Sequence, residues 1–141
     1  MRLGQQIPDF DTTCEWLNSE PLLIGDKPTC FHFWSISCVL CKQAMPHFIK
    51  LCNEYKSKVQ FISVHTPLSD TDNNLFEINK VVEEQELKAP IAVDHNERIS
   101  DAFQVTYVPA YYVFDEFGKL RHIQRGKTNV SMLEKNILRM I

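Results

Sequence analysis

Residues 29–42 of the chain, TCFHFWSISCVLCK, are the stretch that decides the fold. The middle of residues 29–35 is nearly all apolar or aromatic, which is typical of a strand covered on both faces of a sheet. Across residues 39–55 the apolar side chains recur every three or four positions, which predicts a helix. The stretch therefore predicts a buried strand, a turn and a helix, with Cys38 at the amino end of the helix.

Strand and helix signals alternate along the rest of the chain. We expect a short structured piece at residues 15–18, strands at residues 59–64, 91–93, 111–115 and 120–124, and helices at about residues 72–86, 98–103 and 130–141. Pro46 should kink the first helix. In the last helix the expected buried residues are Met132, Leu133, Ile137, Leu138 and Ile141.

The order of these elements predicts the fold class. A β-α-β half followed by a β-β-α half gives an α/β fold, with a central mixed β-sheet flanked by helices on both faces. No repeat, charge block or Ser/Gly-rich linker divides residues 1–141, so we expect a single domain.

Composition excludes several classes of protein. The chain has 141 residues, of which 44% are hydrophobic, enough for one buried core. With 15 basic and 18 acidic residues its formal charge is −3, so it lacks the basic field that non-specific nucleic-acid binding needs. No stretch approaches the roughly 20 apolar residues that span a bilayer. We expect neither a nucleic-acid partner nor a membrane span.

The cysteine count points to a compartment. The total of five is odd, so at least one thiol is unpaired within the chain. Scattered thiols fit a reducing environment, and the amino-terminal residues contain no apolar run of the secretory type. We therefore expect a cytoplasmic protein. The five residues are Cys14, Cys30, Cys38, Cys41 and Cys52.

Cys38 and Cys41 are the candidate catalytic residues. The unpaired N–H groups and the positive dipole at a helix amino end stabilise a thiolate, so the pKa of Cys38 should fall below about 8.5. The spacing of three residues lets the two sulfurs meet within one helical turn. Cys38 would attack a disulfide, and Cys41 would resolve the mixed disulfide.

Two other interpretations of the pair stay open. Two cysteines at this spacing also form half of a tetrahedral zinc site, although the other cysteines and the five histidines offer no compact second half. The pair could also be purely structural, because unpaired cysteine is often buried. Cys14, Cys30 and Cys52 show no spacing that predicts a second redox pair.

Further residues carry a resemblance to a known family. The run from Phe33 to Lys42, Pro46 five residues after the second cysteine, and Val108-Pro109 before a strand resemble thioredoxin-fold proteins. A closer similarity is to the TlpA/ResA-like thiol-disulfide oxidoreductases, especially the thioredoxin-like domains of DipZ and NHL-repeat proteins. It rests on EWLN at 15–18, VHTP at 64–67 and YVPAY at 107–111. The resemblance covers nearly the whole chain and implies a thioredoxin-like fold.

The resemblance also implies a substrate-binding surface. Pro109 would be the family's cis-proline, lying against the cysteine pair. The backbone of Val108 would pair with an extended substrate chain, and Gly126 would lie beside it in a substrate-contacting loop. Trp34 would border the active-site turn. Val39 would contribute apolar surface, since the Val39-Leu40 dipeptide stands where relatives carry Gly-Pro or Glu-Pro.

The proton acceptor for Cys41 is less clearly indicated. His32 occupies the position where thioredoxins carry a buried carboxylate, and an imidazole titrates near neutral pH, so His32 is our candidate. His65 is a weaker one. Asp70 is the nearest acid in sequence after the 64–67 motif, and the sequence does not tell whether it reaches the cysteines.

The leading interpretation is an enzyme that exchanges dithiol for disulfide on protein substrates without a bound cofactor or metal. A reducing cytoplasm favours the reductase direction, which requires an electron-donor reductase as partner, and we expect a monomer. A thiol peroxidase is one alternative, because Ser35 and Cys38 match part of the peroxiredoxin motif, although Phe31 stands where that motif has proline. A non-catalytic binding module that uses the surface around Trp34, Val39, Val108 and Pro109 is another.

Overall fold

The computed structural model describes residues 1–10, 13–22, 24, 26–126 and 130–141. Within these residues six strands form one mixed sheet in the order β1-β4-β3-β2-β5-β6. The strands are β1 (Glu15–Leu17), β2 (Thr29–Trp34), β3 (Gln60–His65), β4 (Ile91–Val93), β5 (Ala110–Phe114) and β6 (Leu120–Arg125). The helices are α1 (Val39–Tyr55), α2 (Leu75–Gln85), α3 (Arg98–Ala102) and α4 (Val130–Leu138), with a 3-10 turn η1 (Asp70–Asn73).

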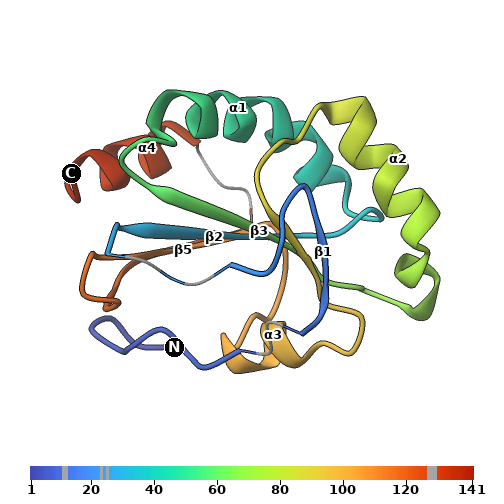
Figure 1. The fold of residues 1–141 in the computed structure, drawn as a ribbon, viewed down its shortest axis with the longest axis horizontal. Coiled ribbons are helices and arrows are strands. Elements are labelled where there is room, and N and C mark those ends of the chain that lie inside the picture. Colours follow the sequence, from blue (N-terminus) through green and yellow to red (C-terminus); the bar gives the residue numbers. More distant parts are fainter. Residues whose placement is uncertain (11–12, 23, 25, 127–129) are drawn as a thin grey trace.

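Helices cover both faces of this sheet. Figure 1 shows α1, α2 and α4 on one face and α3 with the amino-terminal segment on the other. The arrangement is a thioredoxin-like fold, as the order of predicted elements and the resemblance both implied.

The predicted buried strand is β2, which lies in the middle of the sheet. It pairs in parallel with β3 and antiparallel with β5, and all six of its residues are buried. Because side chains alternate along a strand, Cys30 and Trp34 join the core under α1, whereas Phe31 and Phe33 join the core on the α3 face. The strand ends at Trp34, so its carboxyl end delivers the chain directly to the turn before Cys38.

The helix after this turn begins and ends where the sequence predicts. Cys38 is its N-cap, and the helix runs without a break through Pro46, which is exposed. Its buried side packs Met45, Phe48 and Leu51 against the sheet.

Two predicted helices differ in detail from the structure. The helix expected from about residue 72 is divided into η1 and α2, because Asn74 is extended and its side chain caps α2 by accepting a hydrogen bond from Glu77 N. The last helix ends at Leu138. Leu133 and Ile137 are buried as expected, but three residues that we expected to be buried, Met132, Leu138 and Ile141, are exposed.

Candidate active site

Cys38 and Cys41 are joined by a disulfide at the amino end of α1, with their Cα atoms 5.2 Å apart. As the N-cap, Cys38 has extended backbone, and its Sγ accepts a hydrogen bond from Cys41 N at 3.1 Å. The N–H of Cys41 in the first helical turn therefore points toward this sulfur. The same geometry would stabilise a thiolate on Cys38 after reduction.

The two sulfurs differ in their access to solvent. Cys41 is fully buried, whereas Cys38 retains 9% of its surface, and the intervening Val39 and Leu40 are 65% and 40% exposed. A reaction partner can therefore approach Cys38 across an apolar surface, while Cys41 is reachable only from Cys38. The asymmetry fits an attacking and a resolving cysteine.

A loop distant in sequence completes the site. The Val108–Pro109 peptide bond is cis, as the resemblance implied. The carbonyl oxygen of Val108 lies 3.8 Å from Cys38 Sγ. Gly126 N donates a hydrogen bond of 2.9 Å to the carbonyl of Pro109, so the end of β6 lies beside the same loop. Gly126 has φ +69°, and a Cβ there would meet the ring of Tyr107 at 3.5 Å.

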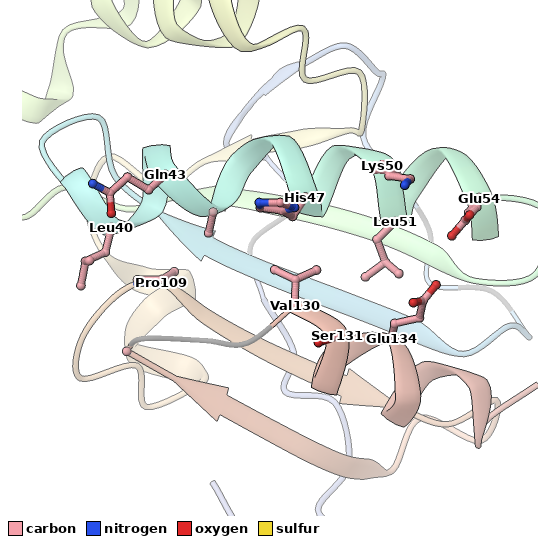
Figure 2. Close-up of a pocket in the computed structure, with 12 residues that line it drawn as sticks. Leu40, Gln43, His47, Lys50, Leu51, Glu54, Pro109, Val130, Ser131 and Glu134 are labelled. Carbon is pink, nitrogen blue, oxygen red and sulfur yellow. The ribbon is translucent and has the colours of Figure 1, made fainter.

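A cavity of about 710 Å³ runs from this loop along α1. Figure 2 shows Leu40 and Pro109 at one end of it, and Glu54 and Glu134 facing each other across the other end, between α1 and α4. Val130 projects into the space between the helices. This groove begins at Leu40, which lies between the two cysteines in sequence, and at Pro109 of the cis peptide bond.

Trp34 does not contribute to the surface of the site. We expected it to border the turn and to contact substrate, but its side chain is fully buried under α1. The expectation of substrate contact is wrong for this structure, because alternation along β2 turns this side chain into the core. The indole instead packs edge-on against His65, with ring centroids 5.0 Å apart.

His32 lies deep in the same core. Its Nδ1 shares a hydrogen bond of 2.9 Å with Oγ of Ser63, its partner across β2 and β3. The ring packs on Phe48 and stacks with Tyr111. Burial lowers the pKa of His32 to about 3, so the imidazole is neutral near physiological pH. Whether it accepts the proton of Cys41 stays a prediction.

The structure reveals a polar network that sequence reasoning missed. Asp72 of η1 is 3% exposed, and its Oδ2 accepts hydrogen bonds from Oγ of Ser35 and Ser37 and from Leu68 N. Burial would raise the pKa of this carboxyl, but these hydrogen bonds outweigh it and lower the pKa below its usual value. Asp70, the acid that the sequence suggested, is exposed.

His65, the last residue of β3, also contacts the turn that precedes Cys38. Its Nε2 accepts a hydrogen bond of 3.2 Å from Ile36 N. Burial is the main cause that lowers the pKa of His65 to about 4. A spacing signal could not reveal either contact, because Ser35 and Asp72 are 37 residues apart and Ile36 and His65 are 29 residues apart.

Ser35 bears on the peroxidase alternative. Its hydroxyl donates to Asp72 at 3.0 Å. This serine therefore already has a structural role in the turn, which favours disulfide exchange over the peroxidase interpretation of the Ser35 and Cys38 pair.

The buried thiols outside the pair have raised pKa values. Cys30 and Cys52 lie in the core under α1, and burial raises the pKa of Cys52 to about 12 and that of Cys30 well above its ordinary value. Cys14 is half-buried in the amino-terminal segment. Cys30 and Cys52 therefore behave as small core residues near neutral pH.

Two features are absent from the part of the chain that the structure describes. No helix there has the length and apolar character needed to cross a membrane. No group of three or more acidic, histidine or cysteine side chains there is arranged to hold a metal ion.

Comparison with known proteins shows a family and several relatives with similar sequences. The model of the AhpC/TSA family matches residues 3–123. The thiol-disulfide oxidoreductase YkuV of Bacillus subtilis is 43% identical over 144 residues, which cover 100% of this chain and 97% of YkuV. Protein DipZ of Mycobacterium bovis is 28% identical over 145 residues, covering 95% of this chain and 20% of DipZ.

A solved structure agrees with the fold. The solution structure of a thioredoxin-like protein in the oxidised form has a TM-score of 0.90 and 43% identity, and the match covers 99% of this chain and 97% of that one. Together with the Cys38–Cys41 disulfide at the amino end of α1, these similarities establish both family and chemistry. The chain belongs to the AhpC/TSA family and is a thioredoxin-fold thiol-disulfide oxidoreductase.

Proposed function

We propose that the protein reduces disulfides in protein substrates, with Cys38 as the nucleophile and Cys41 as the resolving thiol. The observation that supports these roles best is the asymmetry of the pair: Cys38 is the N-cap of α1 at an apolar surface, and Cys41 is fully buried one turn later. Attack from solvent is open to one sulfur only.

The reaction transfers two electrons and two protons from the reduced protein to the substrate disulfide. In the reduced protein the Cys38 thiolate attacks one sulfur of a substrate disulfide, and the other substrate sulfur leaves as a thiolate that takes up a proton. The Cys41 thiol then loses its proton and attacks Cys38 Sγ. The second substrate sulfur leaves, the substrate is a dithiol, and the protein holds the Cys38–Cys41 disulfide.

Several features support a polypeptide as substrate. Val39 and Leu40 form an exposed apolar surface beside Cys38, and the groove along α1 begins at Leu40 and Pro109. Val108 is half-buried next to Cys38, where its backbone could pair with an extended chain in the manner of strand addition. Gly126 closes the same side of the site through its bond to Pro109.

His32 remains our proposed proton acceptor for Cys41. Support comes from its Nε2, which is buried without a hydrogen-bond partner among the described residues: in the neutral tautomer that donates Nδ1–H to Ser63, this nitrogen has an available lone pair. The low pKa makes the imidazole a weak base. Its contribution should therefore be small and should appear as a slower resolution step in His32→Gln.

We propose a monomer in the cytoplasm that is re-reduced by a dithiol reductase. Support comes from the unpaired buried thiols Cys30 and Cys52, which suit a reducing compartment. Size-exclusion chromatography tests the monomer, and localisation of the tagged protein tests the compartment.

A trapping experiment tests the exchange reaction with protein substrates. In Cys41→Ser, Cys38 should form mixed disulfides that cannot be resolved, and these should be recovered from an extract and released by a reductant. The matched control is the double variant Cys38→Ser with Cys41→Ser, which should recover none. Equal recovery from both variants would overturn the assigned roles.

The midpoint potential of the Cys38–Cys41 pair, measured by equilibration with glutathione, decides the direction of the reaction. A midpoint near that of thioredoxin, about −270 mV, supports the reductase direction. A value near that of DsbA, about −120 mV, would overturn it and assign an oxidase instead.

A further inference from the structure

The last residue of β3 and a residue of η1 together hold the redox turn at three consecutive residues, Ser35, Ile36 and Ser37. Asp72 accepts hydrogen bonds from the hydroxyls of Ser35 and Ser37 at 3.0 and 2.8 Å, and His65 accepts one from Ile36 N at 3.2 Å. Cys38 is the next residue. The backbone that presents the nucleophile is thus fixed by two side chains from outside the turn.

Asp72 is itself firmly placed. The same Oδ2 accepts a third hydrogen bond from Leu68 N at 2.8 Å, and Asp72 N donates to the carbonyl of Ser69 at 3.0 Å. The side chain is almost completely buried, and the lowered pKa of its carboxyl keeps it ionised near neutral pH. A buried negative charge therefore lies one hydrogen bond away from the residue that precedes Cys38.

Such a charge acts against a thiolate. The amino end of α1 favours an anion on Cys38, and no acidic residue lies in the first turn of that helix. A like charge behind the turn disfavours the same anion. The reactivity of Cys38 then reflects a balance between the helix, which promotes ionisation, and Asp72, which restrains it.

We propose that Asp72 is a positioning residue for disulfide exchange: it fixes the turn that presents Cys38 and, through its buried charge, restrains formation of the Cys38 thiolate. Besides Cys41, ionisable side chains among the described residues include His65 of β3, which contacts the turn, and Asp70 of η1 and Lys42 of α1, which are neighbours in sequence of Asp72 and Cys41. His65 stays neutral near pH 7 because its pKa is about 4, and Asp70 and Lys42 are exposed, where solvent screens their charges.

The variant that tests this proposal is Asp72→Asn, which removes the charge and keeps an oxygen acceptor for the serines. The thiolate absorbance of the reduced protein should show a lower pKa for Cys38, with a thiolate fraction increased at least about threefold below that pKa. The equilibrium with glutathione should shift toward the reduced protein, because the reduced form is stabilised.

Asp70→Asn is the matched control. It removes the same charge from an exposed position two residues earlier in η1 and should leave both measurements at the wild-type value. If the two variants give the same thiolate titration, the proposed role of Asp72 is overturned. A purely structural role for Asp72 would lower the stability of both redox forms without moving the titration.

A second measurement needs no variant and remains valid if Asp72→Asn fails to fold. In the reduced wild-type protein, the carboxyl carbon resonance of Asp72 should shift as Cys38 ionises, and this inflection should be absent from the oxidised protein. The resonance of Asp70 serves as the internal control. An Asp72 signal that does not respond to the redox state would contradict the proposal.

The inference rests on Cys38 as the reactive thiol, but its readouts need no protein substrate. A shifted titration combined with an empty trap from Cys41→Ser would uphold the role of Asp72 and reject protein substrates. The opposite combination would uphold the proposed function and reject the role of Asp72.

Discussion

The two ends of α1 place cysteines in opposite environments. At the amino end, Cys38 caps the helix beside an exposed apolar surface and is bonded to Cys41. Toward the carboxyl end, Cys52 packs with Cys30 in the core, and burial raises its pKa to about 12. The two cysteines are almost equally buried, so the contrast between a reactive and an inert thiol follows from the position of Cys38 at the amino terminus of α1.

The largest expected effect comes from removing the reactive cysteine at the amino end of α1. Cys38→Ser should lower the rate of insulin disulfide reduction on the order of a thousandfold or more, because it removes the nucleophile. Cys52→Ser is the matched control and should retain most of the activity. A Cys52→Ser protein that folds but is as inactive as Cys38→Ser would show that the buried thiol takes part in the reaction.

Alkylation compares the two ends within one molecule. In the reduced protein near pH 7, iodoacetamide should modify Cys38 at least about a hundredfold faster than Cys52, because burial raises the pKa of Cys52 to about 12 whereas the amino end of α1 should lower that of Cys38. Peptide mass spectrometry after short exposure measures both rates. Comparable labelling of the two residues under native conditions would contradict the inert assignment of Cys52.

The two buried histidines, His32 and His65, should make the free energy of unfolding depend on pH. The unfolded chain protonates His32 and His65 below about pH 6.5, whereas the folded protein keeps both neutral until about pH 4, so the unfolded state binds more protons in this window. The free energy of unfolding should therefore fall with decreasing pH, at a slope that approaches about 2.7 kcal/mol per pH unit for the two groups.

Urea denaturation between about pH 7.5 and pH 4.5 measures this slope. His32→Phe removes one of the two groups and should reduce the slope by about half, whatever its effect on stability at neutral pH. An unchanged slope would mean that His32 titrates alike in the folded and unfolded protein.

The smallest expected effect concerns the exposed apolar surface beside Cys38 at the amino end of α1. Val39→Ser should raise KM for a protein disulfide by about threefold to tenfold while leaving the rate with a small disulfide nearly unchanged, because it removes apolar surface outside the reacting atoms. Stability should change by less than about 0.5 kcal/mol, since Val39 is 65% exposed. Equal losses with both substrates would place Val39 in the chemical step.

Local patterns predicted most of the fold. The apolar run of β2, the periodicity of α1 and the position of Cys38 between them are properties of neighbouring residues, and the structure confirms them. The cis bond before Pro109 is different, since nothing in the residues themselves distinguishes it from a trans bond, and only the family resemblance implied it.

The parts that the sequence did not predict depend on contacts between distant elements. Trp34 follows a period of two along β2, but the sequence alone does not tell which face lies under α1. Asp72 reaches Ser35 only because β3 runs parallel to β2 and ends beside it, so that η1 packs against the turn. Proximity in sequence pointed to Asp70 instead, two residues from the residue that makes the contact.

Both ends of the chain lie away from the redox turn. Residues 4–7 pair with residues 118–120 at the hairpin between β5 and β6, and the start of β2 lies beside the same hairpin. Tyr55 at the end of α1 donates a hydrogen bond to Glu134 of α4, which places the last helix at that side as well (Figure 1). A tether, fluorophore or solid support attached at either terminus would therefore leave Cys38 open, so an immobilised Cys41→Ser protein can serve directly as bait.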